Sequence, residues 1–215
     1  MHWLIIADGE KIEQAFLDQL TPNRKILVCD GAYNYITKTN ITVDVLLGDF
    51  DSIDKKLLAA SRQNHCMRVV DAPDQSATDL DKAICYLDQQ QADNICIAGA
   101  LGLRADHHLY NLRILSRHYQ PNRQLSINTP QQNLFFVRDS TVKLTGYVGA
   151  TVSIFGFNDA MLSSKGLNYD VRHYRLDAHQ NSVCNALQTN EAIMQINGDA
   201  LFVLDQRICF EINTE

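Results

Sequence analysis

The sequence predicts an α/β N-terminal domain with a mostly parallel sheet, followed by an all-β sandwich domain. Up to about residue 120, short apolar runs alternate with amphipathic stretches, a pattern typical of parallel strands connected by helices. After Thr129 and Pro130, helical periodicity is absent and glycines separate short β-rich segments. We therefore expect an α/β domain over 1-128 and a β-sandwich domain over 129-215.

The first half supplies the candidate elements of the parallel sheet. The apolar runs that predict strands are Leu4–Ala7, Ile26–Cys29, Val43–Leu47, Arg68–Val70 and Ile95–Ala98. The amphipathic stretches that predict helices are Lys11–Leu20, Ser52–Arg62, Asp79–Gln90 and Asp106–His118. The third of these helices has the clearest start, because Thr78 is a favourable N-cap residue and Asp81 completes a capping box.

The second half supplies short segments without helical periodicity. The segments that predict strands are Leu134–Val137, Val142–Leu144, Thr151–Phe155, Ala192–Ile196 and Leu201–Leu204. The glycines that separate segments are Gly146, Gly149, Gly156, Gly166 and Gly198. This pattern favours a small sandwich.

Composition excludes some classes of function. Nineteen Lys and Arg against twenty-five Asp and Glu give a formal net charge of -6, and no dense basic run is present, which argues against a nucleic-acid groove. The six cysteines show no C-x-x-C pair or other metal-ligand spacing and are expected to be reduced thiols, and no export signal or membrane span is recognisable. We expect a cytoplasmic protein that binds neither nucleic acid nor membrane.

Acidic residues follow nearly every candidate strand of the first half. Asp8, Asp30, Asp49 and Asp51 each come just after an apolar run. The carboxyl ends of parallel strands meet at one edge of the sheet, where ligands bind. If the strand conformation persists through Phe50, Asp49 and Asp51 point to the same side. Two carboxylates about 4 Å apart repel by about 4 kcal/mol at an effective dielectric near 20.

A divalent cation would relieve this repulsion. Mg²⁺ takes oxygen ligands and typically joins one or two carboxylates to substrate phosphates. Asp79, in the first turn of its helix, is a candidate for a third ligand. Each acid alone is as well explained as a helix cap or a turn residue, whereas the whole set at one sheet edge favours a metal site.

A glycine-bearing loop follows the last strand of the first half. Gly99–Gly102 precedes Arg104 and a helix that begins near Asp106. Backbone N–H groups of such a loop can approach a phosphate, and Arg104 is a natural charge partner for it. The chain contains no G-x-x-x-x-G-K-[ST] loop, which excludes a P-loop kinase.

Four motifs occur along the first half of the chain. Asp30–Asn34 is DGAYN, Gly48–Ile53 is GDFDSI, Pro73–Asp79 is PDQSATD, and Gly99–Asn111 is GALGLRADHHLYN. In this order they resemble the motifs of thiamine pyrophosphokinases, with Asp30–Asn34 a diverged form of the family's DGGAN. The likeness extends over most of the chain and implies an α/β domain followed by a β-sandwich in a homodimer. It also implies Mg²⁺-dependent transfer of diphosphate from ATP to the thiamine hydroxyl, with release of AMP.

The resemblance also implies roles for individual residues. Asp49, Asp51 and Asp79 would be the catalytic acids and would hold Mg²⁺, which orients the polyphosphate of ATP. The residues on the nucleotide and phosphate side would be Asp30, Gln75, Thr78, Gly102, Arg104 and Asp106. Neighbours with less defined tasks would be Asn34, Ser52, His107 and Asn111.

The family's thiamine pocket is completed by the β-domain of a partner subunit. Gly166–Tyr169 is GLNY where the family has GLKW or GLKY, and Asn181–Asn185 is NSVCN near the position of a family SN pair. Tyr169, Cys184 and Asn185 would therefore contact thiamine, with Tyr169 offering an aromatic face to the cationic thiazolium ring. For Tyr169, a place in the ordinary sandwich core is nearly as well supported.

Several positions depart from the family pattern. Leu103 stands where the family has a glycine, which would narrow the phosphate loop or change its backbone angles. Ala32, Tyr33 and Cys184 are further departures. They leave acceptor identity more open than reaction type, so the alternatives are a diphosphokinase for a pterin alcohol, a nucleotide phosphohydrolase on the same scaffold, or a non-catalytic binding module.

Overall fold

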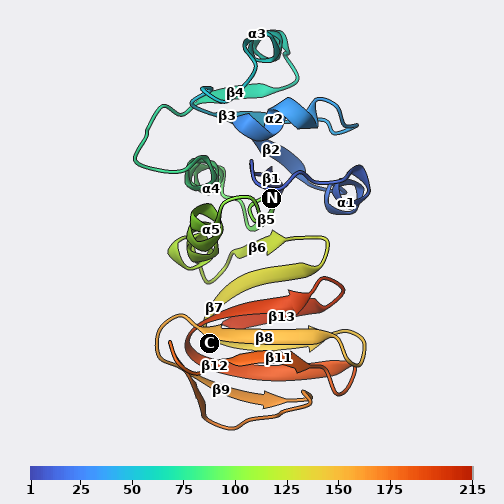
Figure 1. Ribbon diagram of the computed structural model, residues 1–215, viewed down its shortest axis with the longest axis vertical. Coiled ribbons are helices and arrows are strands. Elements are labelled where there is room, and N and C mark those ends of the chain that lie inside the picture. The colour runs from blue at the N-terminus through green and yellow to red at the C-terminus, as the bar shows by residue number, and fades with distance from the viewer. Residues whose placement is uncertain (215) are drawn as a thin grey trace. The chain divides into compact units, whose positions relative to one another are not determined.

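The computed structural model describes residues 1–214, which divide into two compact units (Figure 1). The first unit is Met1–Leu125, and the second begins at Ser126. Strands pair in parallel in the first unit and antiparallel in the second. Within the described residues, no helix is both long enough and apolar enough to cross a membrane.

The first unit is a parallel sheet with the strand order β5-β1-β2-β3-β4. Its strands are β1 (His2–Ile6), β2 (Lys25–Cys29), β3 (Val45–Gly48), β4 (Arg68–Asp71) and β5 (Asn94–Ala98). Its helices are α1 (Gln14–Leu20), α2 (Asp30–Ile36), α3 (Lys55–Gln63), α4 (Asp79–Gln89) and α5 (Ala105–Arg117). Strands β2 and β5 flank β1 on opposite sides, so the order in which strands are added to the sheet changes direction between β1 and β5, which makes this the topological switch point.

Helices cover both faces of this sheet (Figure 1). Leu4 and Ile6 of β1 pack in one cluster with Phe16 and Leu17 of α1 and Ile36 of α2. Successive strand residues point to opposite faces, so the residues between them face the side where α4 and α5 lie. Strands β1, β2, β3 and β5 are therefore buried on both sides, which explains their nearly continuous apolar sequences, whereas the edge strand β4 is partly exposed.

Most of the predicted strands and helices of the first half are confirmed to within a few residues. Thr78 is confirmed as the N-cap of α4, since its hydroxyl oxygen accepts a hydrogen bond from the Asp81 N–H. Helix α2 was not predicted. Its sequence is only seven residues long, contains Gly31, and has no side-chain cap at Cys29, so it carries no ordinary helix signal.

The second unit is built around two long antiparallel strands, β7 (Gln132–Thr145) and β12 (Glu191–Asp205). Its other strands are β8 (Thr151–Gly156), β9 (Ala160–Lys165), β10 (Tyr174–Leu176), β11 (Ser182–Ala186) and β13 (Cys209–Thr214), and β6 (Gln124–Asn128) begins in the first unit. The first half of β12 pairs with β9, and its second half pairs with β8. Buried residues from all of these partners form one cluster that includes Phe135, Phe202 and Leu162.

The prediction from the sequence divided each long strand of the second unit into two shorter strands, which is wrong. Leu134–Val137 and Val142–Leu144 are both parts of β7, and Ala192–Ile196 and Leu201–Leu204 are both parts of β12. The strands are irregular where polar residues interrupt the apolar pattern, because the register of β12 shifts between Ile196 and Asp199. Such a bulge bends a strand without ending it, so the polar residues do not mark a loop.

Candidate functional site

A cavity of about 360 Å³ lies at the carboxyl ends of the parallel strands. Asp8 follows β1, Asp30 follows β2, and Gly99 and Ala100 follow β5, and all of them line it. The cavity therefore spans the switch point between β1 and β5, where open α/β sheets bind their ligands. Thr78 and Asp79, at the start of α4, line it too.

Asp30, Asp49 and Asp51 form a compact acidic group. One carboxylate oxygen from each lies within 4.8 Å of the others, and burial decreases from Asp30, which is buried, to Asp51, which is exposed. Asp79 lies outside this group, although it lines the same cavity as Asp30. The expectation that a strand would align Asp49 with Asp51 is wrong, because β3 ends at Gly48 and Phe50 has a φ of 62°. A turn at Phe50 brings the two carboxylates together instead.

Hydrogen bonds fix the loop that carries these acids. The carboxylate of Asp30 accepts hydrogen bonds from the N–H groups of Gly31 (2.6 Å) and Phe50 (2.8 Å). The Asn34 amide donates to the carbonyl oxygen of Ser52 (2.8 Å) and accepts from the Asp54 N–H (3.0 Å). Asn34 therefore braces the acid loop from helix α2, which gives this predicted neighbour a concrete structural task.

Side chains next to the acids orient their carboxylates. The Gln75 amide donates to Asp49 at 2.6 Å, and the Ser52 hydroxyl donates to Asp51 at 2.6 Å. Together with the Asp51 N–H, the Gln75 amide holds the pKa of Asp49 below its usual value, so Asp49 is ionised near neutral pH. Gln75 and Ser52 were both predicted in the site, and the structure places both at the acid group.

The buried carboxyl of Asp30 is the strongly perturbed acid of the group. Burial and, next, the negative charge of Asp79 raise its pKa to about 6, although the N–H groups of Gly31 and Phe50 act in the opposite direction. Burial and the charge of Asp79 likewise raise the pKa of Asp8, and the cation of Lys11 opposes them. Excess negative charge at this end of the sheet therefore favours binding of a cation.

Lys82 provides positive charge within this region. Its ammonium group lies 3.1 Å from the carboxylate of Asp79, and its side chain is only 9% exposed. The sequence analysis missed Lys82, although its position three residues after Asp79 on a helix places the two side chains on one face. It also gave no role to Asp8, whose place after the first strand was the available signal.

The glycine-bearing loop has a left-handed backbone at Gly99, Gly102 and Leu103, with φ values of 69°, 86° and 56°. Leu103 thus adopts a conformation that glycine adopts more readily than residues with a β-carbon. Its side chain is 83% exposed and lines the cavity. The buried Asn111 amide donates to the carbonyl oxygen of Ala100 (2.6 Å) and so ties helix α5 to the loop.

Arg104 and Asp106 form an exposed ion pair. The guanidinium group of Arg104 donates to both carboxylate oxygens of Asp106, at 3.1 and 2.6 Å. Because both side chains are about two-thirds exposed, the pair is accessible to solvent and the arginine is free to turn to an anion. Arg104 and His107 line the cavity, whereas Asp106 lies beside it.

The predicted residues therefore fall into two sets in the first unit. Those that line the cavity are Asp30, Ser52, Thr78, Asp79, Gly102, Arg104, His107 and Asn111. Those that lie outside the cavity lining are Asn34, Asp49, Asp51, Gln75 and Asp106. Three residues of the second set are still linked to the cavity: Asp49 and Asp51 form the acidic group with Asp30, and the Gln75 amide donates a hydrogen bond to Asp49.

The three residues predicted in the second unit are close to one another. The Asn185 amide accepts a hydrogen bond from the Tyr169 N–H (3.2 Å) and donates one to the Tyr169 carbonyl oxygen (3.0 Å). Tyr169 is 75% exposed, so its alternative placement in the sandwich core is wrong. Cys184 is exposed and has a φ of 58° at the point where the register of β11 shifts.

The fold and cavity define an α/β protein with an acid-lined site at the switch point of a parallel sheet. The family model described as "Thiamin pyrophosphokinase, catalytic domain" matches residues 17–127, slightly more than half of the chain. The chain belongs to the thiamine pyrophosphokinase family.

Individual relatives agree with this membership. Thiamin pyrophosphokinase 1 of Caenorhabditis elegans is 26% identical over 196 residues, which cover 82% of this chain and 76% of the relative. The crystal structure of thiamine pyrophosphokinase from Bacillus subtilis has a TM-score of 0.82 at 21% identity, covering 95% of this chain and 99% of that one. That of thiamin pyrophosphokinase from Candida albicans has a TM-score of 0.79 at 16% identity, covering 95% and 89%. The two structures share the fold of this chain.

Proposed function

We propose that this chain catalyses the Mg²⁺-dependent transfer of diphosphate from ATP to the hydroxyl of thiamine, giving thiamine diphosphate and AMP. Membership of the thiamine pyrophosphokinase family supports the reaction. The observation that carries the proposal is the group of Asp30, Asp49 and Asp51 beside a cavity at the switch point of the sheet. The carboxylates of this group are suitable ligands for a divalent cation, and the glycine-bearing loop that lines the cavity is suitable for binding a polyphosphate.

The acidic group fits Mg²⁺. Its carboxylate oxygens lie within 4.8 Å of one another, and oxygen ligands around octahedral Mg²⁺ stand about 3 to 4 Å apart, so small side-chain rotations suffice. Asp30, Asp49 and Asp51 would hold the ion, and Asp79, which lines the same cavity as Asp30, would bind it directly or through water. The bound ion would neutralise charge on the polyphosphate and orient it.

The other residues of the first unit would position ATP. Arg104 would exchange its exposed partner Asp106 for a phosphate, and Thr78 and Gly102 line the same cavity. Gln75 would keep the carboxylate of Asp49 in its binding orientation. The thiamine hydroxyl attacks the β-phosphorus in line as AMP leaves, so the protein acts mainly by positioning and by neutralising charge. We assign no general base.

The second unit would supply the acceptor side of the reaction. The exposed ring of Tyr169, held through its backbone by Asn185, is available to the thiazolium ring of thiamine, and Cys184 lies next in the chain to Asn185. We propose that the enzyme is a cytoplasmic homodimer and that these residues complete the site of a partner subunit.

The direct test is incubation of the purified protein with ATP, Mg²⁺ and thiamine, followed by chromatography of the products. Equal amounts of AMP and thiamine diphosphate are expected. ADP with thiamine monophosphate would instead identify a simple kinase. Without any thiamine-dependent product, a pterin alcohol and then water would be tested as the acceptor, and the proposal would be overturned.

Asp51→Asn tests the acidic group. The substitution removes one charge from an exposed side chain, so we expect the fold to survive and turnover to fall by about 100-fold or more. Asp71→Asn is the matched control, because Asp71 is the last residue of the neighbouring strand β4 but is paired with Arg62 outside the group. Turnover by Asp51→Asn close to that of Asp71→Asn would remove the metal argument.

A further inference from the structure

Two helices of the first unit contribute to the same cavity. Thr78 and Asp79, which are the N-cap and the first residue of helix α4, line this cavity, and so do His107 and Asn111 of helix α5. Because these residues come from separate helices, the geometry of the cavity depends on how α4 and α5 are held together. A displacement of about 1 Å at such a site can reduce turnover about 100-fold.

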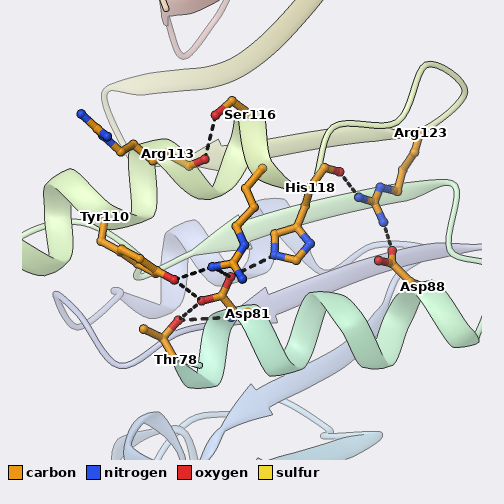
Figure 2. A network of polar contacts seen from close by, with 9 residues as sticks. Thr78, Asp81, Asp88, Tyr110, Arg113, Ser116, His118 and Arg123 are labelled. Atoms are coloured by element: carbon orange, nitrogen blue, oxygen red, sulfur yellow. Dashed lines mark hydrogen bonds and ion pairs between the residues drawn. The ribbon is translucent and has the colours of Figure 1, made fainter. Parts of the chain in front are cut away.

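The carboxylate of Asp81 joins the two helices (Figure 2). One of its oxygens accepts hydrogen bonds from the hydroxyl groups of Thr78 and Tyr110, both at 2.8 Å. Its other oxygen lies 2.9 Å from Nε2 of His118, which directly follows α5. The side chain of Asp81 is only 3% exposed, so groups from both helices meet at one buried charge.

This arrangement requires a carboxylate. Both of its oxygens face donor groups: the hydroxyls of Thr78 and Tyr110 donate to one oxygen, and Nε2 of His118 and the guanidinium group of Arg117 lie 2.9 and 3.6 Å from the other. The hydroxyl of Tyr110 also accepts a hydrogen bond from Arg117 (2.8 Å), so its own proton is directed at Asp81. An asparagine in place of Asp81 would keep one acceptor oxygen and turn an N–H₂ group towards groups that donate.

We propose that Asp81 is a positioning residue for diphosphate transfer, which sets the place of Asp79 on α4 relative to the residues that α5 brings to the cavity. This inference rests on the proposed function. Asp81 is outside the cavity lining and contacts neither the acidic group nor the glycine loop. It acts through Thr78, which caps α4 one residue before Asp79.

The other end of α4 provides a matched control. Asp88, in the last turn of α4, forms an ion pair with Arg123, which also donates to the carbonyl oxygen of His118 (Figure 2). Asp88 therefore ties α4 to the segment that follows α5, as Asp81 ties it to α5, but it lies seven residues further from the cavity. Removing either carboxylate should weaken the packing of the two helices. Of the two carboxylates, that of Asp81 is the one bonded to a residue of the cavity lining, Thr78.

The experiment compares Asp81→Asn and Asp88→Asn at a temperature where unfolding curves show both to be fully folded. We expect kcat of Asp81→Asn to fall about tenfold or more, with KM for thiamine within about twofold and a higher Mg²⁺ concentration for half-maximal rate. Asp88→Asn should keep kcat within about twofold. Equal kcat values for the two variants would overturn the proposal.

A second variant keeps the test decisive if Asp81→Asn does not fold. Tyr110→Phe removes one donor and leaves the carboxylate in place, and it should lower kcat about threefold or more relative to Asp88→Asn.

Failure of the proposed function itself is distinguishable from failure of this inference, because the unmodified protein would then make no thiamine diphosphate. In that case the measured quantity is the rise in melting temperature that Mg²⁺ and ATP cause, in place of kcat. An equal rise for Asp81→Asn and Asp88→Asn would overturn the inference.

Discussion

Leu103 holds a backbone conformation in which a side chain is unfavourable. Its φ of 56° lies in the left-handed region, which costs a residue with a β-carbon about 1 kcal/mol or more. The side chain itself is 83% exposed, so it gains little from burial that would offset this cost. The backbone at Leu103, next to Arg104, is therefore locally strained.

We predict that Leu103→Gly is more stable than Leu103→Ala by about 1 kcal/mol. Both variants remove the exposed side chain, but only glycine relieves the strain. At an unstrained position the order is reversed, because glycine loses more conformational freedom on folding. Urea unfolding of the two variants measures the difference, and a more stable alanine variant would show that the loop is not strained.

Asp30 makes the stability of the metal-free protein depend on pH. Its pKa of about 6 in the folded chain is above the ordinary value of 3.8. A raised carboxyl pKa means that the folded state binds the proton more tightly, so this contribution to stability is complete below pH 4 and is lost as the pH rises through 6. A shift of about two units corresponds to about 3 kcal/mol.

We therefore predict that Asp30→Asn changes the pH profile of unfolding. Between pH 4 and pH 7 in EDTA, the unmodified protein should lose about 2.4 kcal/mol of unfolding free energy relative to the variant, which carries no charge at this position. Chemical unfolding across this pH range measures the difference. Parallel profiles for the two proteins would mean that Asp30 has an ordinary pKa.

At the scale of elements, the sequence predicts the strands and helices that have a clear apolar periodicity or a capping residue. It does not predict turns and short helices that have no such signal. Strands β1, β2 and β5 of the parallel sheet are buried on both faces and are nearly continuous apolar runs, so they were recognisable. Asp49 and Asp51 were expected at the site because the carboxyl ends of parallel strands meet at one edge, and Asp79 was expected there from its place in the first turn of a helix. The close approach of Asp30 to Asp49 and Asp51 was not, because it depends on the turn at Phe50 and on the unpredicted helix α2.

The long strands of the second unit illustrate the opposite error. Polar residues interrupt the apolar pattern of both β7 and β12, and each interruption was taken as the end of a strand. Asp139 and Gly198 occupy positive φ values of 42° and 98°, and the carboxylate of Asp139 accepts a hydrogen bond from the Gly198 N–H at 2.7 Å. The two strands are irregular together, so pairing continues past the interruption, which single-strand periodicity does not reveal.

Gly198 is predicted to be essential to this irregularity. A β-carbon at Gly198 would lie 2.6 Å from the carbonyl oxygen of Asp159, in addition to the strain of its positive φ. Gly198→Ala should therefore destabilise the protein by about 3 kcal/mol, the sum of a backbone cost and a clash with main chain. Thermal or urea unfolding gives the value.

Gly149→Ala is the control for the strand prediction. Gly149 has a similar φ of 87°, but a β-carbon there would meet no atom within 4 Å. It should cost only the backbone strain, about 1 kcal/mol. Equal losses for the two alanine variants would show that the contact with Asp159 relaxes freely.

On the scale of the whole molecule, the two units differ in how their structure relates to function. In the first unit, acids that would repel one another are held together by backbone N–H groups and by Asn34, which favours a bound cation over the empty site. In the second unit, the pair of Tyr169 and Asn185 is fixed by backbone hydrogen bonds while the tyrosine ring stays exposed. The first unit therefore holds unfavourable charge that a ligand can relieve.

This difference predicts how ligands change the melting temperature. A ligand present at 100 times its Kd stabilises the folded state by about 2.7 kcal/mol, which for a chain of this size raises the melting temperature by about 5 to 10 °C. We expect Mg²⁺ with ATP to produce such a rise, and ATP with EDTA to produce little, because the acids of Asp30, Asp49 and Asp51 repel the polyphosphate unless a cation lies between them. Asp51→Asn should lose most of the rise and Asp71→Asn should keep it. A rise of the same size with ATP in EDTA would mean that the nucleotide binds through Arg104 and the glycine loop alone, and that the acidic group serves a later step than binding.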